Sequence, residues 1–144
     1  MKIIKCISSI ILFSVIGVNS AFAEVKIADN EEIISLMKGG VPLIDVRTLE
    51  EWQKTGVIKD SKLLTFFDKN GNSDVEDWMH QLRKIVSKDD PVIILCRSGK
   101  RSGIVSDILS EKMNFSKVYN ANSGIIGWIN DGQKTTMDGL HNTK

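Results

Sequence analysis

Cysteine and histidine are scarce in this 144-residue chain, which contains two of each. So few such residues exclude a framework of several disulfide bonds and a Cys/His-rich zinc module. Neither sign of charge is in excess, because 19 Lys and Arg residues face 18 Asp and Glu residues, for a formal net charge of +1. This balance indicates neither a nucleic-acid-binding stripe nor an acidic tail. We therefore expect no metal ion, no cofactor and no nucleic-acid partner.

The chain does contain enough apolar sequence for one folded domain. Hydrophobic residues make up 42% and charged residues 26%, which is typical of a soluble globular protein and not of a disordered chain. No internal repeat, low-complexity segment or interdomain linker is visible. We expect a single domain over residues 24–132, followed by a polar and frayed tail over residues 133–144.

Residues 1–23 have the features of a secretory signal peptide in the usual order. Two lysines near the start precede an almost wholly apolar run over residues 6–18, and Ala21-Phe22-Ala23 then has the small-x-small pattern of a cleavage site. The apolar run is too short to span a bilayer comfortably, which favours a cleaved signal peptide. The alternatives to a cleaved signal are an uncleaved membrane anchor and a buried strand. Cleavage after Ala23 predicts a periplasmic or secreted protein without stable membrane association.

Removal of this leader would leave Cys96 as the only cysteine, because Cys6 is lost with it. A lone cysteine cannot form an internal disulfide bond, even in an oxidising compartment. Cys96 is then a buried inert residue, a partner in an intermolecular disulfide or a reactive thiol.

Strand-like and helix-like segments alternate from Asp29 onward. Short apolar runs predict strands at residues 43–46, 61–64, 92–95 and 118–119. Capping-box pairs predict helices that begin after Asp29, Thr48 and Ser73, the last of them running over residues 75–86, and apolar spacing predicts others near residues 104–109 and 125–129. This alternation predicts an α/β domain with a mainly parallel sheet, but not the order of its strands.

The segment that most clearly points to chemistry follows the apolar run Val92–Leu95, and it reads Cys96-Arg97-Ser98-Gly99-Lys100-Arg101-Ser102. Ligands of α/β sheets bind at the carboxyl ends of strands, where a tight loop entering a helix presents backbone N–H groups and the positive end of the helix dipole. Three cations add to this field. A cysteine in such a loop is expected to be largely thiolate, in a cradle that fits an anion. A buried structural cysteine beside a solvated basic turn is the alternative.

The chain resembles the rhodanese-like family in three segments, in the order in which that family has them. They are Leu43-Ile44-Asp45-Val46-Arg47 with Glu50, Glu51 and Trp52; the loop from Cys96 to Ser102; and Val118-Tyr119-Asn120 through Gly124, Gly127 and Trp128. It departs at Gly56-Val57-Ile58, where relatives usually have Gly-His-Ile, and at Ser123-Gly124, where they usually have Gly-Gly. The resemblance implies a three-layer α/β fold, with helices on both faces of the sheet, and a sulfurtransferase loop with a persulfide on Cys96.

The function expected from these residues is that of a rhodanese-type thiosulfate sulfurtransferase. The Cys96 thiolate would take the sulfane sulfur of a small anionic donor such as thiosulfate, and a thiol or cyanide acceptor would remove it. We expect the rest of the loop to bind the substrate; its residues are Arg97, Ser98, Gly99, Lys100, Arg101 and Ser102. The alternative for the three cations is a solvated basic face, and the alternative for the two serines is helix capping. Asp45 and Arg47 are expected to support the fold near the site.

Two other functions remain open at this point. One is a module that binds or carries sulfur for a partner without turnover. The other is a cysteine phosphatase or arsenate reductase, but phosphatases of that kind place an arginine six positions after the cysteine, where this chain has Ser102.

Overall fold

A parallel β-sheet forms the centre of the computed structural model, which describes residues 24–138 and 140. The predicted signal peptide lies outside the described residues. The strands are β1 (Lys26–Ala28), β2 (Leu43–Asp45), β3 (Lys62–Leu63), β4 (Val92–Leu95) and β5 (Val118–Ala121), in the spatial order β1-β5-β4-β2-β3. Each neighbouring pair is parallel, which confirms the predicted α/β class.

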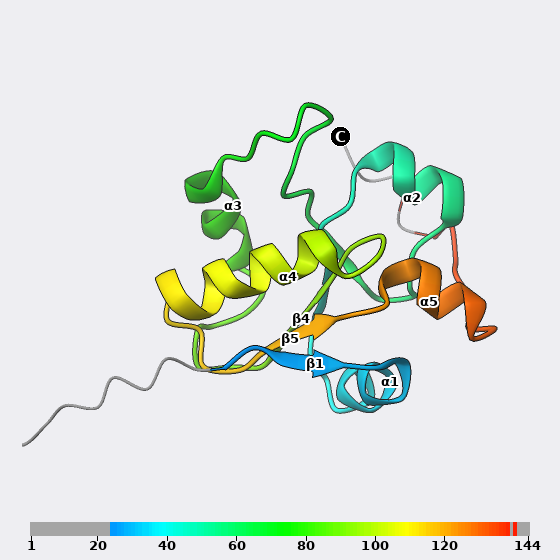
Figure 1. Cartoon of the computed structure of the whole chain (residues 1–144), viewed down its shortest axis with the longest axis horizontal. Helices are drawn as coiled ribbons and strands as arrows, with labels where there is room; N and C mark the ends of the chain where they lie inside the picture. The colour runs from blue at the N-terminus through cyan, green and yellow to red at the C-terminus, as the bar shows by residue number, and fades with distance from the viewer. Residues whose placement is uncertain (1–23, 139, 141–144) are drawn as a thin grey trace, which may run out of the picture.

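Helices cover both faces of this sheet (Figure 1). They are α1 (Asn30–Lys38), α2 (Leu49–Thr55), α3 (Val75–Leu82), α4 (Lys100–Asp107) and α5 (Gly124–Asn130), and a π-helical segment, η1 (Ile108–Lys112), continues α4. Within the described residues, no helix is long and apolar enough to cross a membrane.

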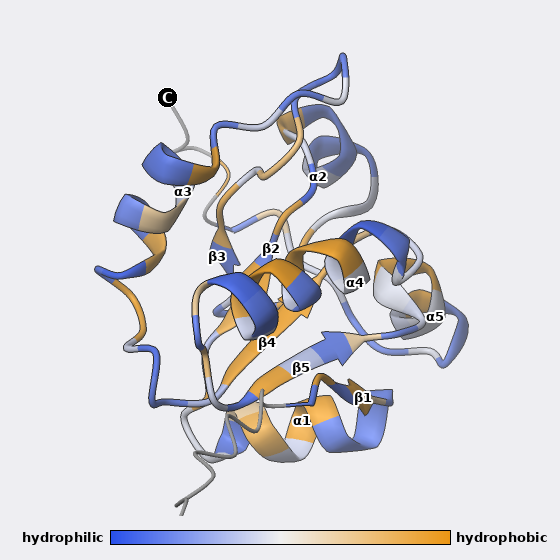
Figure 2. Ribbon diagram, turned by 60° about the vertical axis from the view of Figure 1, so that its left-hand side comes forward, coloured by the Kyte–Doolittle hydropathy of each residue, from blue (hydrophilic) through white to orange (hydrophobic). Residues whose placement is uncertain are grey.

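The central strand β4 shows why three layers form. All four of its residues are buried and apolar, and Figure 2 shows the strand as hydrophobic along its length. Val92 and Ile94 pack into the apolar cluster that includes side chains of α3 and α4, whereas Ile93 and Leu95 pack into the cluster that includes side chains of α1 and α5. Successive side chains of a strand point to opposite faces of the sheet. A strand whose residues are all apolar therefore requires helices packed on both faces. The three-layer prediction is confirmed.

Helices α1, α2, α4 and α5 all begin at the same edge of the sheet. Since the strands are parallel, the chain leaves β2, β4 and β5 at their carboxyl ends, and it enters α2, α4 and α5 there (Figure 1). This edge therefore gathers loops that lie far apart in the sequence.

Some boundaries differ from those that the sequence predicted. Strand β1 was not predicted; it pairs with β5 at the edge of the sheet. Asp74, not Ser73, caps α3, since its carboxylate accepts the N–H of Asp77. The helix ends at Leu82 and turns replace its predicted last turn.

The prediction of a frayed tail is wrong for the residues just after α5. Thr136 and Val57 exchange two backbone hydrogen bonds, of 2.8 and 2.9 Å, in an isolated antiparallel bridge. The indole Nε1 of Trp128 donates to the carbonyl of Lys134 at 3.0 Å. We call residues 133–138 the C-terminal strap, because they join the end of α2 to α5 through these contacts.

Candidate functional site

Cys96 lies directly after β4 and is buried, with 1% of the residue exposed. Its sulfur atom accepts two hydrogen bonds: the backbone N–H of Gly99 donates at 3.2 Å and the hydroxyl of Ser102 at 3.3 Å. Both donors belong to the loop or to the first turn of α4. Donors aimed at one sulfur atom stabilise negative charge on it.

The shape of this loop depends on two glycines. Gly99 has φ of +87°, and a Cβ added there would lie 1.8 Å from the carbonyl oxygen of Asn122. Gly124 has φ of +59°, and its added Cβ would lie 2.4 Å from the carbonyl oxygen of Arg97. The backbone of the Cys96 loop thus packs directly against the backbone that leads into α5, at a distance that only glycine permits.

Hydrogen bonds fix the same contact. The N–H of Ile125 donates to the carbonyl of Cys96 at 3.0 Å, and that of Ile126 donates to the carbonyl of Arg97 at 3.2 Å. The two residues that follow β4 are therefore held by the first turn of α5.

Asn120 is a site residue that the sequence did not single out. It lies in β5 with its side chain buried beside the loop, where its Oδ1 accepts the hydroxyl of Ser102 at 2.7 Å and its Nδ2 donates to the carbonyl of Gly99 at 3.3 Å. The amide thus holds the carbonyl of Gly99 and the hydroxyl oxygen of Ser102 in place. The single hydroxyl proton of Ser102 is divided between Asn120 Oδ1 and the sulfur of Cys96, whereas the N–H of Gly99 donates to the sulfur alone. The only sequence signal of Asn120 was its place in the third segment of the family pattern.

The three cations of the loop have different surroundings. Arg97 and Lys100 are exposed, and neither forms an ion pair with any residue that the structure describes. Arg101 is only partly exposed and forms a two-pronged contact with Glu51 of α2, at 2.5 Å (Nη2 to Oε1) and 2.9 Å (Nη1 to Oε2). The contact joins α4 to α2.

The Arg101–Glu51 contact changes the pKa of both groups. The hydrogen bond to Glu51 raises the pKa of Arg101, against the smaller effect of burial. Burial by itself raises the pKa of Glu51, but the hydrogen bonds from Arg101 and from the backbone N–H of Thr48 outweigh it, so this pKa lies below its ordinary value of 4.5. Both side chains are therefore charged at neutral pH.

Asp45 and Arg47 form a buried ion pair at the carboxyl end of β2, with 2.7 Å between Oδ2 and Nη2. The guanidinium of Arg47 also donates to the hydroxyl of Thr55 at 2.7 Å and to the carbonyl of Gly56 at 3.0 Å. The pair thus ties the end of α2 to the sheet, and no donor of Arg47 faces the sulfur of Cys96.

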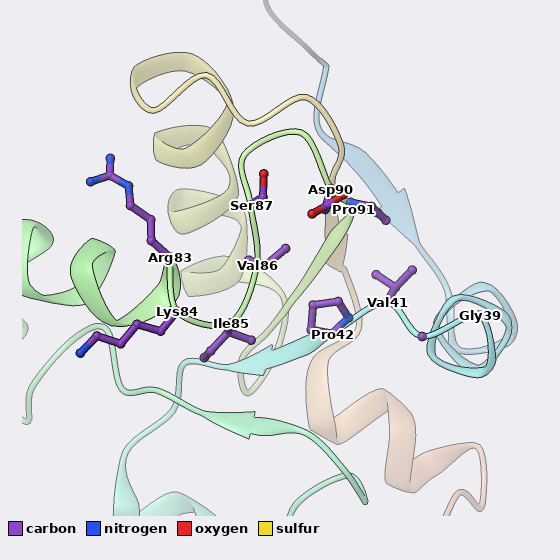
Figure 3. A pocket seen from close by; sticks show the side chains of 11 residues that line it. Gly39, Val41, Pro42, Arg83, Lys84, Ile85, Val86, Ser87, Asp90 and Pro91 are labelled. Carbon is purple, nitrogen blue, oxygen red and sulfur yellow. The ribbon is translucent and has the colours of Figure 1, made fainter.

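Two pockets differ in their relation to this chemistry. One, of about 270 Å³, lies beside the Cys96 loop between α2 and α5, and it is lined by Arg47, Glu51, Lys54, Thr55, Arg97, Ile125 and Ile126. The other, of about 430 Å³, precedes β2 and β4 at the opposite edge of the sheet. In Figure 3 the charged ends of Arg83 and Lys84 point away from Val41 and Pro42 of that pocket, which lies at the edge of the sheet opposite to Cys96.

The structure brings together only part of the predicted site. Cys96, Gly99 and Ser102 meet at the sulfur atom, whereas Ser98 is exposed. Among the residues described, no cluster of three or more His, Cys, Asp or Glu side chains has the arrangement of a metal site.

Comparisons with known proteins agree with this architecture. Residues 29–131 match the model of the rhodanese-like domain. An uncharacterized protein of Rickettsia rickettsii is 35% identical over 88 residues, which is 59% of this chain and 69% of that protein. A rhodanese-related protein from Thermoplasma volcanium superposes with a TM-score of 0.60 at 20% identity, over 78% of this chain and 99% of the other. The polysulfide-sulfur transferase of Wolinella succinogenes gives a TM-score of 0.60 at 18% identity, over 83% of each chain.

Proposed function

Because this chain belongs to the rhodanese-like domain family, we propose that it is a sulfurtransferase that carries sulfane sulfur as a persulfide on Cys96. The observation that carries the proposal is the pair of donors on the Cys96 sulfur, the N–H of Gly99 and the hydroxyl of Ser102. A structural cysteine in an apolar core needs neither donor. The sulfur-transfer activity of one structural neighbour, a polysulfide-sulfur transferase, supports the same class of reaction.

The reaction has two steps. The Cys96 thiolate attacks the outer sulfur of thiosulfate; a new S–S bond forms on the protein, and the old one breaks as sulfite leaves with its electron pair. A thiol or cyanide then attacks the outer sulfur of the persulfide and releases the thiolate. The donors on the Cys96 sulfur stabilise the thiolate that attacks the donor in the first step and that is released again in the second.

The cations of the loop have separate roles in this proposal. Arg97 and Lys100, which are exposed and without an ion pair in the described part of the chain, attract the anionic donor. Arg101, held by Glu51, positions the first turn of α4.

Intact-protein mass spectrometry tests the proposal on reduced, folded protein that begins at Glu24. Incubation with thiosulfate should add one sulfur atom, which cyanide or a thiol then removes. Cys96→Ser is the control; it should gain no sulfur while its circular dichroism spectrum stays that of the wild type. If no sulfane donor loads the wild type, the protein is better described as a binding module without turnover. A separate assay addresses the phosphatase alternative, which hydrolysis of an aryl phosphate would indicate.

We also propose that the protein is exported and cleaved after Ala23, on the sequence pattern of residues 1–23. N-terminal sequencing of protein from the cell envelope should begin at Glu24. Recovery of the full-length chain from the membrane fraction would contradict this.

A further inference from the structure

Asn120 brings an amide into the apolar interior next to the Cys96 loop. It lies on the same face of β5 as Val118, which packs into the apolar cluster that includes side chains of α3 and α4, and only 6% of the residue is exposed. A buried amide costs free energy unless its polar atoms are hydrogen-bonded. Nδ2 donates to the carbonyl of Gly99 and Oδ1 accepts from Ser102, so both atoms are satisfied by the loop or by α4.

The orientation of the Asn120 amide is fixed by its neighbours. The carbonyl of Gly99 can only accept a hydrogen bond, so it faces Nδ2 and leaves Oδ1 toward Ser102. Helix α4 packs closely on the amide, because a Cβ added at Gly103 would lie 3.3 Å from Nδ2. Since Oδ1 is an acceptor only, its contact with Ser102 requires the hydroxyl proton of that serine.

Asn120 and Cys96 therefore compete for one proton. The hydroxyl oxygen of Ser102 lies 2.7 Å from Oδ1 of Asn120 and 3.3 Å from Sγ of Cys96. When the hydroxyl points to the sulfur, Oδ1 loses this donor while it remains buried. When the hydroxyl points to Oδ1, the sulfur keeps the N–H of Gly99 as a donor. The charge on the sulfur decides between these two orientations.

That charge differs between the two states of the proposed reaction cycle. In the thiolate the negative charge lies on Sγ of Cys96, where a charge-assisted hydrogen bond from Ser102 is strongest. In the persulfide the charge lies on the outer sulfur, and Sγ, which is bonded to Cβ and to that sulfur, is nearly neutral. The hydroxyl of Ser102 then makes its stronger hydrogen bond with the amide oxygen of Asn120, at the shorter of the two distances.

We propose that Asn120 is a positioning residue that stabilises the persulfide relative to the thiolate, because it accepts the hydroxyl of Ser102 when Sγ carries no charge. This rests on the proposed function of Cys96. In the loading step the thiolate bonds to the outer sulfur of thiosulfate, the S–S bond of the donor breaks, and sulfite leaves with the electron pair. The proton stays on Ser102 throughout and only its direction changes, so Asn120 acts on the loading equilibrium through Ser102.

The equilibrium of sulfur loading tests this at one pH and a fixed ratio of thiosulfate to sulfite. Intact-protein mass spectrometry gives the equilibrium constant for the wild type, Asn120→Leu, Ser102→Ala and the double variant. Asn120→Leu keeps the shape of the side chain but removes both polar atoms. This substitution should lower the loading constant about fivefold more in the wild-type background than in the Ser102→Ala background, as expected for one hydrogen bond. The lost contact with Gly99 is common to both backgrounds and cancels.

Asn30→Leu is the matched control. Asn30 is also buried, with 7% of the residue exposed, but its amide donates to Asp131 at the end of α5 and not to the Cys96 loop. This substitution should change the loading constant by the same factor in the wild-type and Ser102→Ala backgrounds.

A second measurement uses the wild type and does not depend on the folding of any variant. The ¹³C resonance of the Asn120 side-chain carbonyl should move downfield when sulfur is loaded, because Oδ1 then gains the hydroxyl of Ser102 as a donor. The corresponding resonance of Asn30 should not move.

The outcomes are distinguishable. Equal factors for Asn120→Leu in the two backgrounds, or an Asn120 resonance that stays in place on loading, would show that Asn120 only supports the fold. Either result would leave persulfide formation on Cys96 intact. A wild type that no sulfane donor loads would instead refute the proposed function and this inference with it.

Discussion

Gly99 shows how much of the site depends on one residue. Its positive φ and its contact with the backbone of Asn122 both exclude a side chain. Gly99→Ala should therefore distort the loop, withdraw the N–H from Cys96 and lower the rate of persulfide formation more than about tenfold. Gly71 is a matched control, since its φ is +82° but nothing lies within 4 Å of its added Cβ. Gly71→Ala should cost about 1 kcal/mol of unfolding free energy and leave the rate unchanged.

The Asp45–Arg47 pair is the second residue-scale feature with a measurable consequence. Arg47→Met leaves the carboxylate of Asp45 buried without its partner, so the unfolding free energy from urea denaturation should fall by about 3 kcal/mol or more. The double variant Asp45→Asn with Arg47→Met should recover part of this loss. Arg83→Met, at an exposed position, is the control. An equal effect of Arg47→Met and Arg83→Met would show that the pair contributes no stability.

At the scale of elements, the contact of Glu51 with Arg101 joins α2 to α4 and should depend on pH. The pKa of Glu51 is lower in the folded protein than its ordinary value of 4.5, so the folded state favours the charged form. Its stabilisation is fully present above pH 4.5 and is lost as the pH falls through the lowered pKa. Glu51→Gln keeps an acceptor for the N–H of Thr48 but removes the charge.

Chemical denaturation at several pH values measures this effect. At pH 7 Glu51→Gln should be less stable than the wild type by about 1 kcal/mol or less, because both side chains are partly exposed and screened. The difference should shrink below pH 4.5. A difference that does not change between pH 7 and pH 3 would mean that the ion pair is not its cause.

For the whole molecule, the C-terminal strap holds the end of α2 against the rest of the fold through the bridge between Val57 and Thr136. A chain that stops after Gly132 loses this bridge and the acceptor of Trp128, so its thermal midpoint should fall and the amide of Val57 should exchange faster. A chain that stops after Asp138 keeps both contacts and is the control. Equal midpoints for the two chains would show that the strap does not stabilise the domain.

Several features of this protein were determined by local sequence. The apolar run of β4 predicts a strand covered on both faces, and the Thr48–Glu51 capping box forms as its spacing predicts. The position of Cys96 at the end of a strand, before glycine and the start of a helix, was likewise visible. These features depend on residues within a few positions of one another, so composition and spacing suffice to predict them.

Other features were decided only by the tertiary structure, because they join residues far apart in the chain. Asn120 reaches Ser102 from a neighbouring strand, and Arg101 contacts Glu51 across 50 positions of sequence. The loop of Cys96 requires glycine at position 99 for a reason that lies in the backbone of Asn122, which the loop's own sequence does not contain. Parallel strands bring these segments to one edge of the sheet, and only that packing distinguishes Arg101, which is held by Glu51, from Arg97 and Lys100, which stay exposed.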